Sequence, residues 1–198
     1  MSQLQCVNIA KKFNQEVVFK DFNYTFEHPN KYAILGENSS GKSTLIKIIG
    51  GLLMPSKGVV NHSFQTEISD SISYTSPDLE LLEDYTVQEV FDFHYQFKKA
   101  KFHISEQLHI ASLQKYRKKK YGQLSSGLKN KVKVSLALFS DTPILLLDEP
   151  CTNFDEKNVD WYQQMILRFC QKQLIIVGSN QLSEYNFCNH LINLKQFK

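Results

Sequence analysis

The chain carries, from residue 36 to residue 43, the stretch Gly36-Glu37-Asn38-Ser39-Ser40-Gly41-Lys42-Ser43. It fits the pattern G-x-x-x-x-G-K-[ST], in which the glycines let the backbone turn so that successive N–H groups point inward. The short apolar run Tyr32 to Leu35 precedes it, and a helical pattern from Lys42 to Ile49 follows. This order of strand, loop and helix predicts a phosphate-binding loop, because a helix N-terminus attracts anions.

The loop residues suit a nucleotide that carries Mg²⁺. We expect the Lys42 ammonium to reach the β- and γ-phosphates and the Ser43 hydroxyl to bind the metal ion. The alternative is a glycine-rich turn that carries lysine and serine by chance. The predicted nucleotide contacts within this stretch are Gly36, Glu37, Asn38, Ser39, Ser40, Gly41, Lys42, Ser43 and Thr44.

A second acidic motif follows the apolar run Ile144 to Leu147, where Asp148 and Glu149 come directly before Pro150. Ligands of parallel sheets bind at the carboxyl ends of the strands, which is where these acids would stand. We expect Asp148 to hold Mg²⁺ through water and Glu149 to orient and deprotonate an attacking water molecule. Acids at a strand end can also be solvated caps.

The remaining pattern predicts an α/β fold with a parallel sheet, because buried strands and helices alternate in the last third of the chain. The first third is rich in β-strand residues, whereas Thr86 to about Lys120 lacks proline and glycine and mixes aromatic with charged residues. We interpret that middle stretch as a helical insertion, although Val90 to Phe97 also alternates as a strand would. The other predicted strands are Leu4–Ile9, Val17–Phe26 and Leu174–Val177; the other predicted helices are Leu128–Phe139 and about Lys157–Gln171.

Composition limits the function classes. Lys and Arg number 23 against 20 Asp and Glu, so the net charge of +3 does not indicate a nucleic-acid binder. The four cysteines are widely spaced, which argues against a zinc site or a disulfide framework and suits a reducing cytoplasm. The start shows no secretion signal, and the apolar runs are far shorter than the ~20 residues that cross a bilayer. We expect a cytoplasmic protein, peripheral where it works at a membrane.

Leu124-Ser125-Ser126-Gly127 opens a helix about twenty residues before the Asp148 strand. Alone it would be a helix N-cap, but at this distance it resembles the L-S-G-G-Q signature of the ATP-binding cassette, or ABC, family. The resemblance implies a single domain over residues 1–198: a P-loop NTPase (RecA-like) parallel-sheet core, an antiparallel β-subdomain and a helical subdomain inserted at about 78–135. In that family two cassettes enclose two ATP molecules, each held by one P-loop and the other chain's signature. The resemblance therefore assigns Ser125 and Gly127 to the γ-phosphate of a partner cassette.

Further positions follow from the same resemblance. Phe13 would stack on adenine, or it is a core aromatic residue near the sheet edge. Pro77 stands where the family has a glutamine that touches Mg²⁺, and Asn180 stands at the place of the switch histidine. The side chain of proline cannot bind a cation, and asparagine can donate a hydrogen bond but cannot carry charge. These departures predict intact nucleotide binding and slow hydrolysis, with Asn180 near the γ-phosphate.

The expected partners are separate membrane-spanning permease subunits and a second cassette, in a homodimer or a heterodimer, without nucleic acid. The aromatic residues at 91, 93, 95 and 97 pack inside the helical insertion or line the permease groove. The basic run Lys115 to Lys120 is a solvated surface or a contact to anionic headgroups. Two other functions remain: a soluble ABC ATPase without transport, and a regulatory cassette that binds ATP and hydrolyses it weakly.

Overall fold

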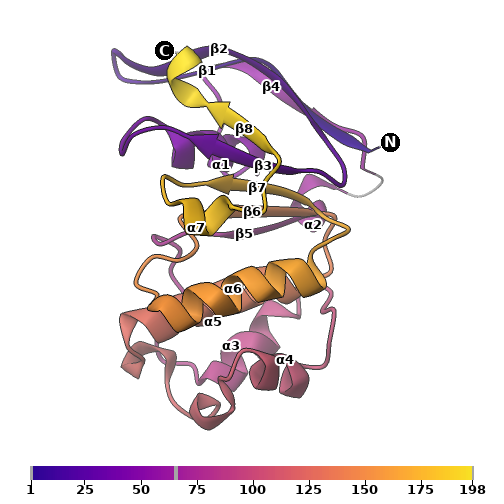
Figure 1. The fold of residues 1–198 in the computed structure, drawn as a ribbon, viewed down its shortest axis with the longest axis vertical. Coiled ribbons are helices and arrows are strands. Elements are labelled where there is room, and N and C mark those ends of the chain that lie inside the picture. Colours follow the sequence, from indigo (N-terminus) through magenta and orange to yellow (C-terminus); the bar gives the residue numbers. More distant parts are fainter. Residues whose placement is uncertain (1, 65–66, 198) are drawn as a thin grey trace. The chain divides into compact units, whose positions relative to one another are not determined.

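Two structural units make up the protein, as seen in a computed structural model that describes residues 2–64 and 67–197. The first unit combines the chain up to Tyr74 with Pro143–Glu149 and the segment from Lys172 onward. The second unit contains Thr75–Thr142 and Pro150–Gln171. The chain therefore passes between the units several times, and each unit draws its residues from separate parts of the sequence (Figure 1).

A five-stranded sheet with the order β5-β6-β7-β3-β8 forms the centre of the first unit. Its inner strands β3 (Lys31–Leu35), β6 (Ile144–Asp148) and β7 (Leu174–Gly178) pair in parallel, and β8 (His190–Asn193) pairs in parallel with β3. The outer strand β5 covers Ile72–Thr75. All residues of β6 and β7 are buried, which explains their continuous apolar sequence. The predicted parallel-sheet core is confirmed.

The antiparallel β-subdomain is also confirmed, as a three-stranded sheet with the order β2-β1-β4. Strands β1 (Gln3–Phe13), β2 (Glu16–Glu27) and β4 (Lys57–His62) build it. Alternate residues such as Leu4, Phe22 and Phe26 point into a core that they share with side chains of β3 and α1. The sequence pattern did not predict β4.

Short helices complete the first unit. Helix α1 (Lys42–Ile49) follows the glycine-rich loop, and α2 (Ile68–Ser71) precedes β5. Near the C-terminus, α7 (Leu182–Tyr185) and the 3₁₀ turn η3 (Leu194–Phe197) flank β8. The ring of Phe197 packs edge-on against Phe22 with the centroids 4.7 Å apart, so η3 lies against the antiparallel sheet.

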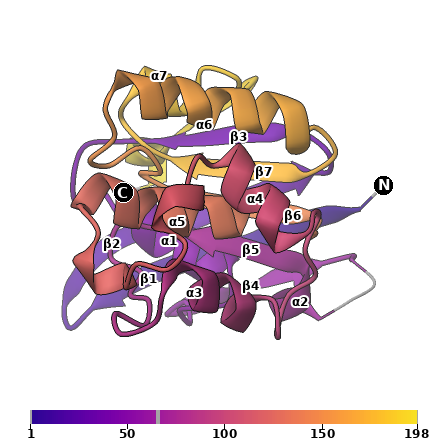
Figure 2. The same cartoon turned by 90° about the horizontal axis from the view of Figure 1, so that it is seen from below.

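The second unit is helical, and it includes the middle stretch that the sequence predicts as helical together with Pro150–Gln171 (Figure 2). It contains α3 (Val87–His94), α4 (Ile104–Ile110), α5 (Ser126–Phe139) and α6 (Glu156–Phe169), with the 3₁₀ turns η1 (Gln114–Tyr116) and η2 (Tyr121–Gln123). A capping box between Thr86 and Glu89 starts α3, so this local signal overrides the strand-like alternation after Val90. Lys131 of α5 joins α6 through a 2.7 Å hydrogen bond from its Nζ to Oδ1 of Asn158.

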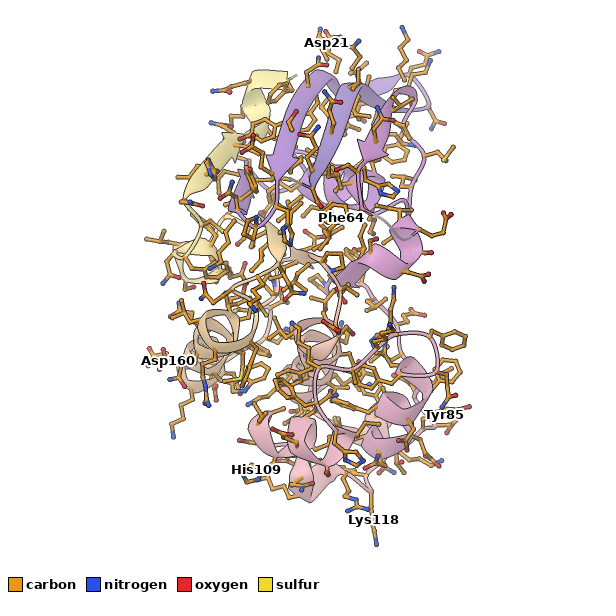
Figure 3. All side chains as sticks on the ribbon, turned by 90° about the vertical axis from the view of Figure 1, so that its right-hand side faces the viewer. Asp21, Phe64, Tyr85, His109, Lys118 and Asp160 are labelled. Atoms are coloured by element: carbon orange, nitrogen blue, oxygen red, sulfur yellow. The ribbon has the colours of Figure 1, made fainter. Side chains whose placement is uncertain are left out.

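Two surface features of the helical unit were left open by the sequence. Among the aromatic residues of the insertion, Phe91 is fully buried, whereas Phe93 and Phe97 are 46% and 70% exposed. The basic run from Lys115 is exposed except at Tyr116, and the Lys118 side chain points away from the unit (Figure 3). Over residues 2–64 and 67–197, the helices are too short or too polar to span a bilayer.

Candidate functional site

The glycine-rich loop leaves β3 at Leu35 and enters α1 at Lys42. Gly41 has a φ of 102°, and a Cβ atom there would lie 2.5 Å from Cγ1 of Val18. Both the left-handed backbone and the close approach require glycine at this position. The loop thus folds back against β2 and presents the N-terminus of α1.

Lys42 is 4% exposed, and its ammonium lies against the loop itself. Nζ donates to the carbonyl oxygens of Gly36 at 2.8 Å and Glu37 at 3.0 Å. The Glu37 carboxylate accepts a hydrogen bond from Nζ of Lys195 at 2.5 Å, which fastens the loop to the C-terminal turn η3. The positive charge of Lys42 is therefore held against the loop at the start of α1, where a helix N-terminus favours an anion.

The two predicted acids stand at the carboxyl end of β6. Asp148 is 2% exposed, while Glu149 is partly exposed and has a φ of 43°. The Glu149 N–H donates to the Gly178 carbonyl at 2.9 Å, which holds this strained residue at the sheet edge. Non-glycine residues in the left-handed region are uncommon and gather at functional sites.

Eight predicted residues of the first unit line one cavity of about 280 Å³, whereas Gly36, Glu37, Ser40, Asp148 and Asn180 are not among its lining residues. Phe13 is 50% exposed at its rim, so it is no core residue, and its ring lies 5.0 Å from the Lys11 ammonium. The cavity brings an exposed aromatic ring, a buried lysine and a carboxylate together around the loop. Its lining consists of Phe13, Glu16, Val18, Asn38, Ser39, Gly41, Lys42, Ser43, Thr44 and Glu149.

Asn180 follows β7, far along the chain from the phosphate-binding loop, and its side chain contacts that loop. Its Nδ2 donates to Oδ1 of Asn38 at 3.0 Å. The turn that carries Asn180 is fixed by Ser179, whose hydroxyl donates to the buried Glu184 and accepts from the N–H of Gln181. Asn180 is thus a positioned amide at the phosphate-binding loop.

Ser125 and Gly127 belong to the second unit and are absent from the lining of that cavity. Ser125 caps α5, because its Oγ accepts from the N–H of Leu128 at 3.4 Å. A Cβ atom at Gly127 would lie 2.7 Å from the Asn153 carbonyl oxygen, so this glycine allows a close approach of two backbones. The N-cap alternative therefore describes the local geometry correctly, and it leaves the Ser126 and Gly127 N–H groups at an open helix N-terminus.

Sequence reasoning missed two polar side chains on the buried face of α5. Asn130 is 4% exposed and donates to the carbonyl oxygens of Pro150 and Thr152, both at 2.8 Å. Lys133 is 7% exposed and donates to the carbonyl oxygens of Ser76 at 3.2 Å and Pro77 at 2.6 Å. Both lie in the polar stretch Lys129-Asn130-Lys131-Val132-Lys133 of α5, so the sequence holds no signal that marks their side chains as buried.

Comparison with known proteins gives a consistent result. The family model described as ABC transporter matches residues 19–152, which span the phosphate-binding loop, the signature stretch and the two acids. The uncharacterized ABC transporter ATP-binding protein YybJ of Bacillus subtilis is 27% identical, over 91% of this chain and 86% of its own. The cytochrome c biogenesis ATP-binding export protein CcmA of Wolbachia pipientis is 28% identical, over 91% of both chains.

Solved structures share the fold. A putative ABC transporter ATP-binding protein from Pyrococcus furiosus has a TM-score of 0.80 at 23% identity, over 99% of each chain. A dimeric bacterial ABC transporter cassette has a TM-score of 0.80 at 21% identity, over 96% of this chain and 93% of its own.

Proposed function

Because the chain belongs to the ABC transporter family, we propose that it is the subunit that binds and hydrolyses ATP to drive separate membrane-spanning subunits. One cassette then covers residues 1–198, with the helical insertion at about 78–135. The single observation that carries the proposal is the cavity of about 280 Å³, where the phosphate-binding loop, Phe13 and Glu149 meet. An aromatic ring, an anion-binding loop and a carboxylate are the groups that adenine, phosphates and an attacking water need.

Binding is the first part of this mechanism. The Phe13 ring stacks on adenine, and the N–H groups of Gly36 through Thr44 surround the phosphates at the start of α1. Lys42 exchanges its two loop carbonyls for β- and γ-phosphate oxygens, which are stronger acceptors because they are charged. The buried position of Lys42 strengthens this attraction, since water screens it poorly there.

Hydrolysis is the second part. Glu149 accepts a proton from a water molecule as that water attacks the γ-phosphorus, and the bond between the γ-phosphorus and the bridging oxygen of ADP breaks. Asn180 donates a hydrogen bond to the γ-phosphate from its place beside Asn38. The Ser43 hydroxyl and the Asp148 carboxylate are hard oxygen donors that fit Mg²⁺, which would neutralise phosphate charge when bound.

Completion of the site requires a second cassette, either another copy of this chain or a different one. Ser125 and Gly127 of one cassette contact the γ-phosphate held by the other, Ser125 through its hydroxyl and Gly127 through its N–H. The exposed Ser125 side chain at the N-terminus of α5 supports this role, because the helix dipole favours an anion there.

The membrane-spanning partner docks on the second unit. An apolar groove of about 460 Å³ is lined by Leu82, Phe93, Phe97 and their neighbours, and these three side chains are 45%, 46% and 70% exposed. An exposed apolar groove of this kind fits a partner helix. This docking would place the chain on the cytoplasmic face of the membrane as a peripheral subunit.

A cassette that hydrolyses slowly and paces a more active partner is the second candidate. The hydrogen bond between Asn180 and Asn38 favours it, because a neutral amide occupies the switch position and already has a partner. Pro77 adds to this, since its side chain cannot bind Mg²⁺ as the family's glutamine would, and its backbone carbonyl already accepts a hydrogen bond from Lys133.

The sandwich of two cassettes is tested with the substitution Glu149→Gln. This variant should accumulate an ATP-bound dimer, because ATP binds and closes the pair but hydrolysis no longer opens it. The added substitution Ser125→Arg should return it to a monomer, because a larger and longer side chain at the signature keeps the partner's ATP from binding there. Light scattering with and without ATP measures both states. A double variant that stays dimeric with ATP would exclude this arrangement.

A further inference from the structure

The loop of residues 76–83, the first part of the connection between β5 and α3, lines two cavities of the helical unit. On one side it borders a polar cavity of about 600 Å³ that also contains Ser126, Lys129 and Lys133 of α5. On the other side it borders the apolar groove of Phe93 and Phe97. The loop therefore borders both the cavity beside the signature and the proposed docking groove, which Leu136 of α5 also lines, and we call it the dividing loop.

Lys133 holds the start of the dividing loop. Its ammonium is buried and donates to the carbonyl oxygens of two consecutive residues, Ser76 and Pro77. Lys133 also lines the polar cavity of about 600 Å³, so two charge-assisted hydrogen bonds, and not the exclusion of water, hold its ammonium to the loop. The start of the loop and the middle of α5 are thus expected to move together.

Lys129, one helical turn earlier on α5, holds the end of the loop. Its Nζ lies 2.8 Å from Oε1 of Glu83, and it also lies 5.4 Å above the Tyr121 ring. The Glu83 carbonyl accepts the N–H of Gly122 at 2.9 Å. The helix that begins at the signature therefore contacts both ends of the loop, at positions four residues apart on one helix face.

We propose that Lys133, assisted by Lys129, is a positioning residue that couples the dividing loop to the signature at the start of α5. A displacement of the loop by a partner in the groove then reaches Ser125 through two lysine contacts inside one unit. This coupling rests on the proposed function, in which the groove seats the membrane-spanning partner and Ser125 contacts ATP on a second cassette. The Lys133 contact also links α5 to the backbone carbonyl of Pro77, because the proline side chain has no polar group to form such a link.

Hydrogen exchange tests the coupling without the membrane partner. The parent protein carries Glu149→Gln and is compared with and without ATP and Mg²⁺. Dimer formation should slow amide exchange at residues 126–129 of α5. If the loop is coupled to this helix, exchange at residues 78–83 should slow as well, by about tenfold in each segment.

Lys133→Met keeps the aliphatic stem and removes the donor. In this variant, ATP should still slow exchange at 126–129, but exchange at 78–83 should change less than about twofold. Lys131→Met is the matched control, because Lys131 lies on the same helix, is also 7% exposed, and donates to Asn158 of α6 instead of the loop. The control should behave as the parent does in both segments.

The outcomes separate the two proposals. Equal slowing at 78–83 in the parent and in Lys133→Met overturns the coupling and leaves the dimer intact. Absence of slowing at 126–129 in the parent overturns the sandwich and, with it, the coupling. If Lys133→Met does not fold, Lys133→Ser takes its place, because a short polar side chain leaves the Ser76 and Pro77 carbonyls to water in the cavity that Lys133 lines. Equal slowing at 78–83 in Lys133→Ser and in the parent then overturns the coupling.

Discussion

Nδ2 of Asn180 lies 3.0 Å from Oδ1 of Asn38, so the residue after β7 is joined directly to the phosphate-binding loop. The two residues are 142 positions apart in the sequence. They meet because β3 and β7 are neighbouring parallel strands whose carboxyl ends lie at the same edge of the sheet. This contact fixes the amide beside the loop that, in the proposed function, holds the γ-phosphate.

We expect Asn180→His to raise ATP turnover, because a histidine can carry positive charge and stabilise the charge that develops on the γ-phosphate. The gain should be at most the ~10²- to 10³-fold of one transition-state donor. Steady-state phosphate release measures it, and the dissociation constant for ATP should barely change. If Asn180→His leaves turnover unchanged while Asn180→Ala abolishes it, the asparagine is already the effective donor.

Lys42→Ala should abolish the stabilisation of the fold by ATP and Mg²⁺. A ligand that binds only the native state adds about 2.7 kcal/mol at 100 times its dissociation constant, and this gain disappears when the phosphate contact is lost. Thermal unfolding with and without ATP measures the difference. Lys195→Met is the matched control, since this lysine contacts the same loop through an exposed ion pair with Glu37. A full ATP-dependent shift in Lys42→Ala would show that the phosphates bind elsewhere.

The phosphate-binding loop and its flanking strand could be predicted because their signals are local. The apolar run to Leu35, the two glycines and the helical pattern after Lys42 all lie within 18 residues of each other, from Tyr32 to Ile49. Strand β4 could not be predicted in the same way. Its residues Lys57–His62 are mostly exposed, and it forms by pairing with β1, some fifty residues away, rather than by its own pattern.

Two side-chain contacts of α5 also could not be predicted from the sequence. Asn130 and Lys133 fall within a helix that the sequence predicted correctly, but their acceptors are backbone carbonyls of distant segments. Backbone acceptors occur at every residue, so no residue type in the partner segment marks them. Only the folded chain shows that these side chains hold the segments that contain Pro77 and Pro150.

Lys101→Met should lower the free energy of unfolding by about 1 to 3 kcal/mol. The Lys101 ammonium donates to the carbonyl oxygens of Leu138 at 2.8 Å and Phe169 at 3.2 Å, near the C-termini of α5 and α6. Removing it leaves the carbonyl oxygens of Leu138 and Phe169 without this charged donor in a partly buried place. Urea unfolding measures the change, and the exposed Lys99→Met variant serves as control. Equal stabilities of the two variants would contradict this capping role.

His94 should make the second unit less stable in acid. Its Nε2 lies 2.9 Å from Oγ of Ser140, whose hydrogen is donated to the Leu136 carbonyl. His94 therefore donates from Nε2 in its neutral form. Burial, with a smaller contribution from the Lys98 charge, lowers the pKa of His94 from 6.5 to about 4.

The sign of the pH effect follows from this shift. Between about pH 6.5 and pH 4, the unfolded chain binds a proton at His94 that the folded chain does not, so stability falls as the pH falls through this window. The full loss in the free energy of unfolding is on the order of 3 kcal/mol. Partial exposure of the imidazole ring to water makes the loss smaller. His94→Gln keeps a donor for Ser140 and cannot titrate. Urea unfolding of both proteins is measured at pH 7, 5.5 and 4.5. The stability of the parent relative to His94→Gln should decrease with each step into acid. Parallel pH profiles would show that His94 is protonated in the folded protein as easily as in the unfolded chain.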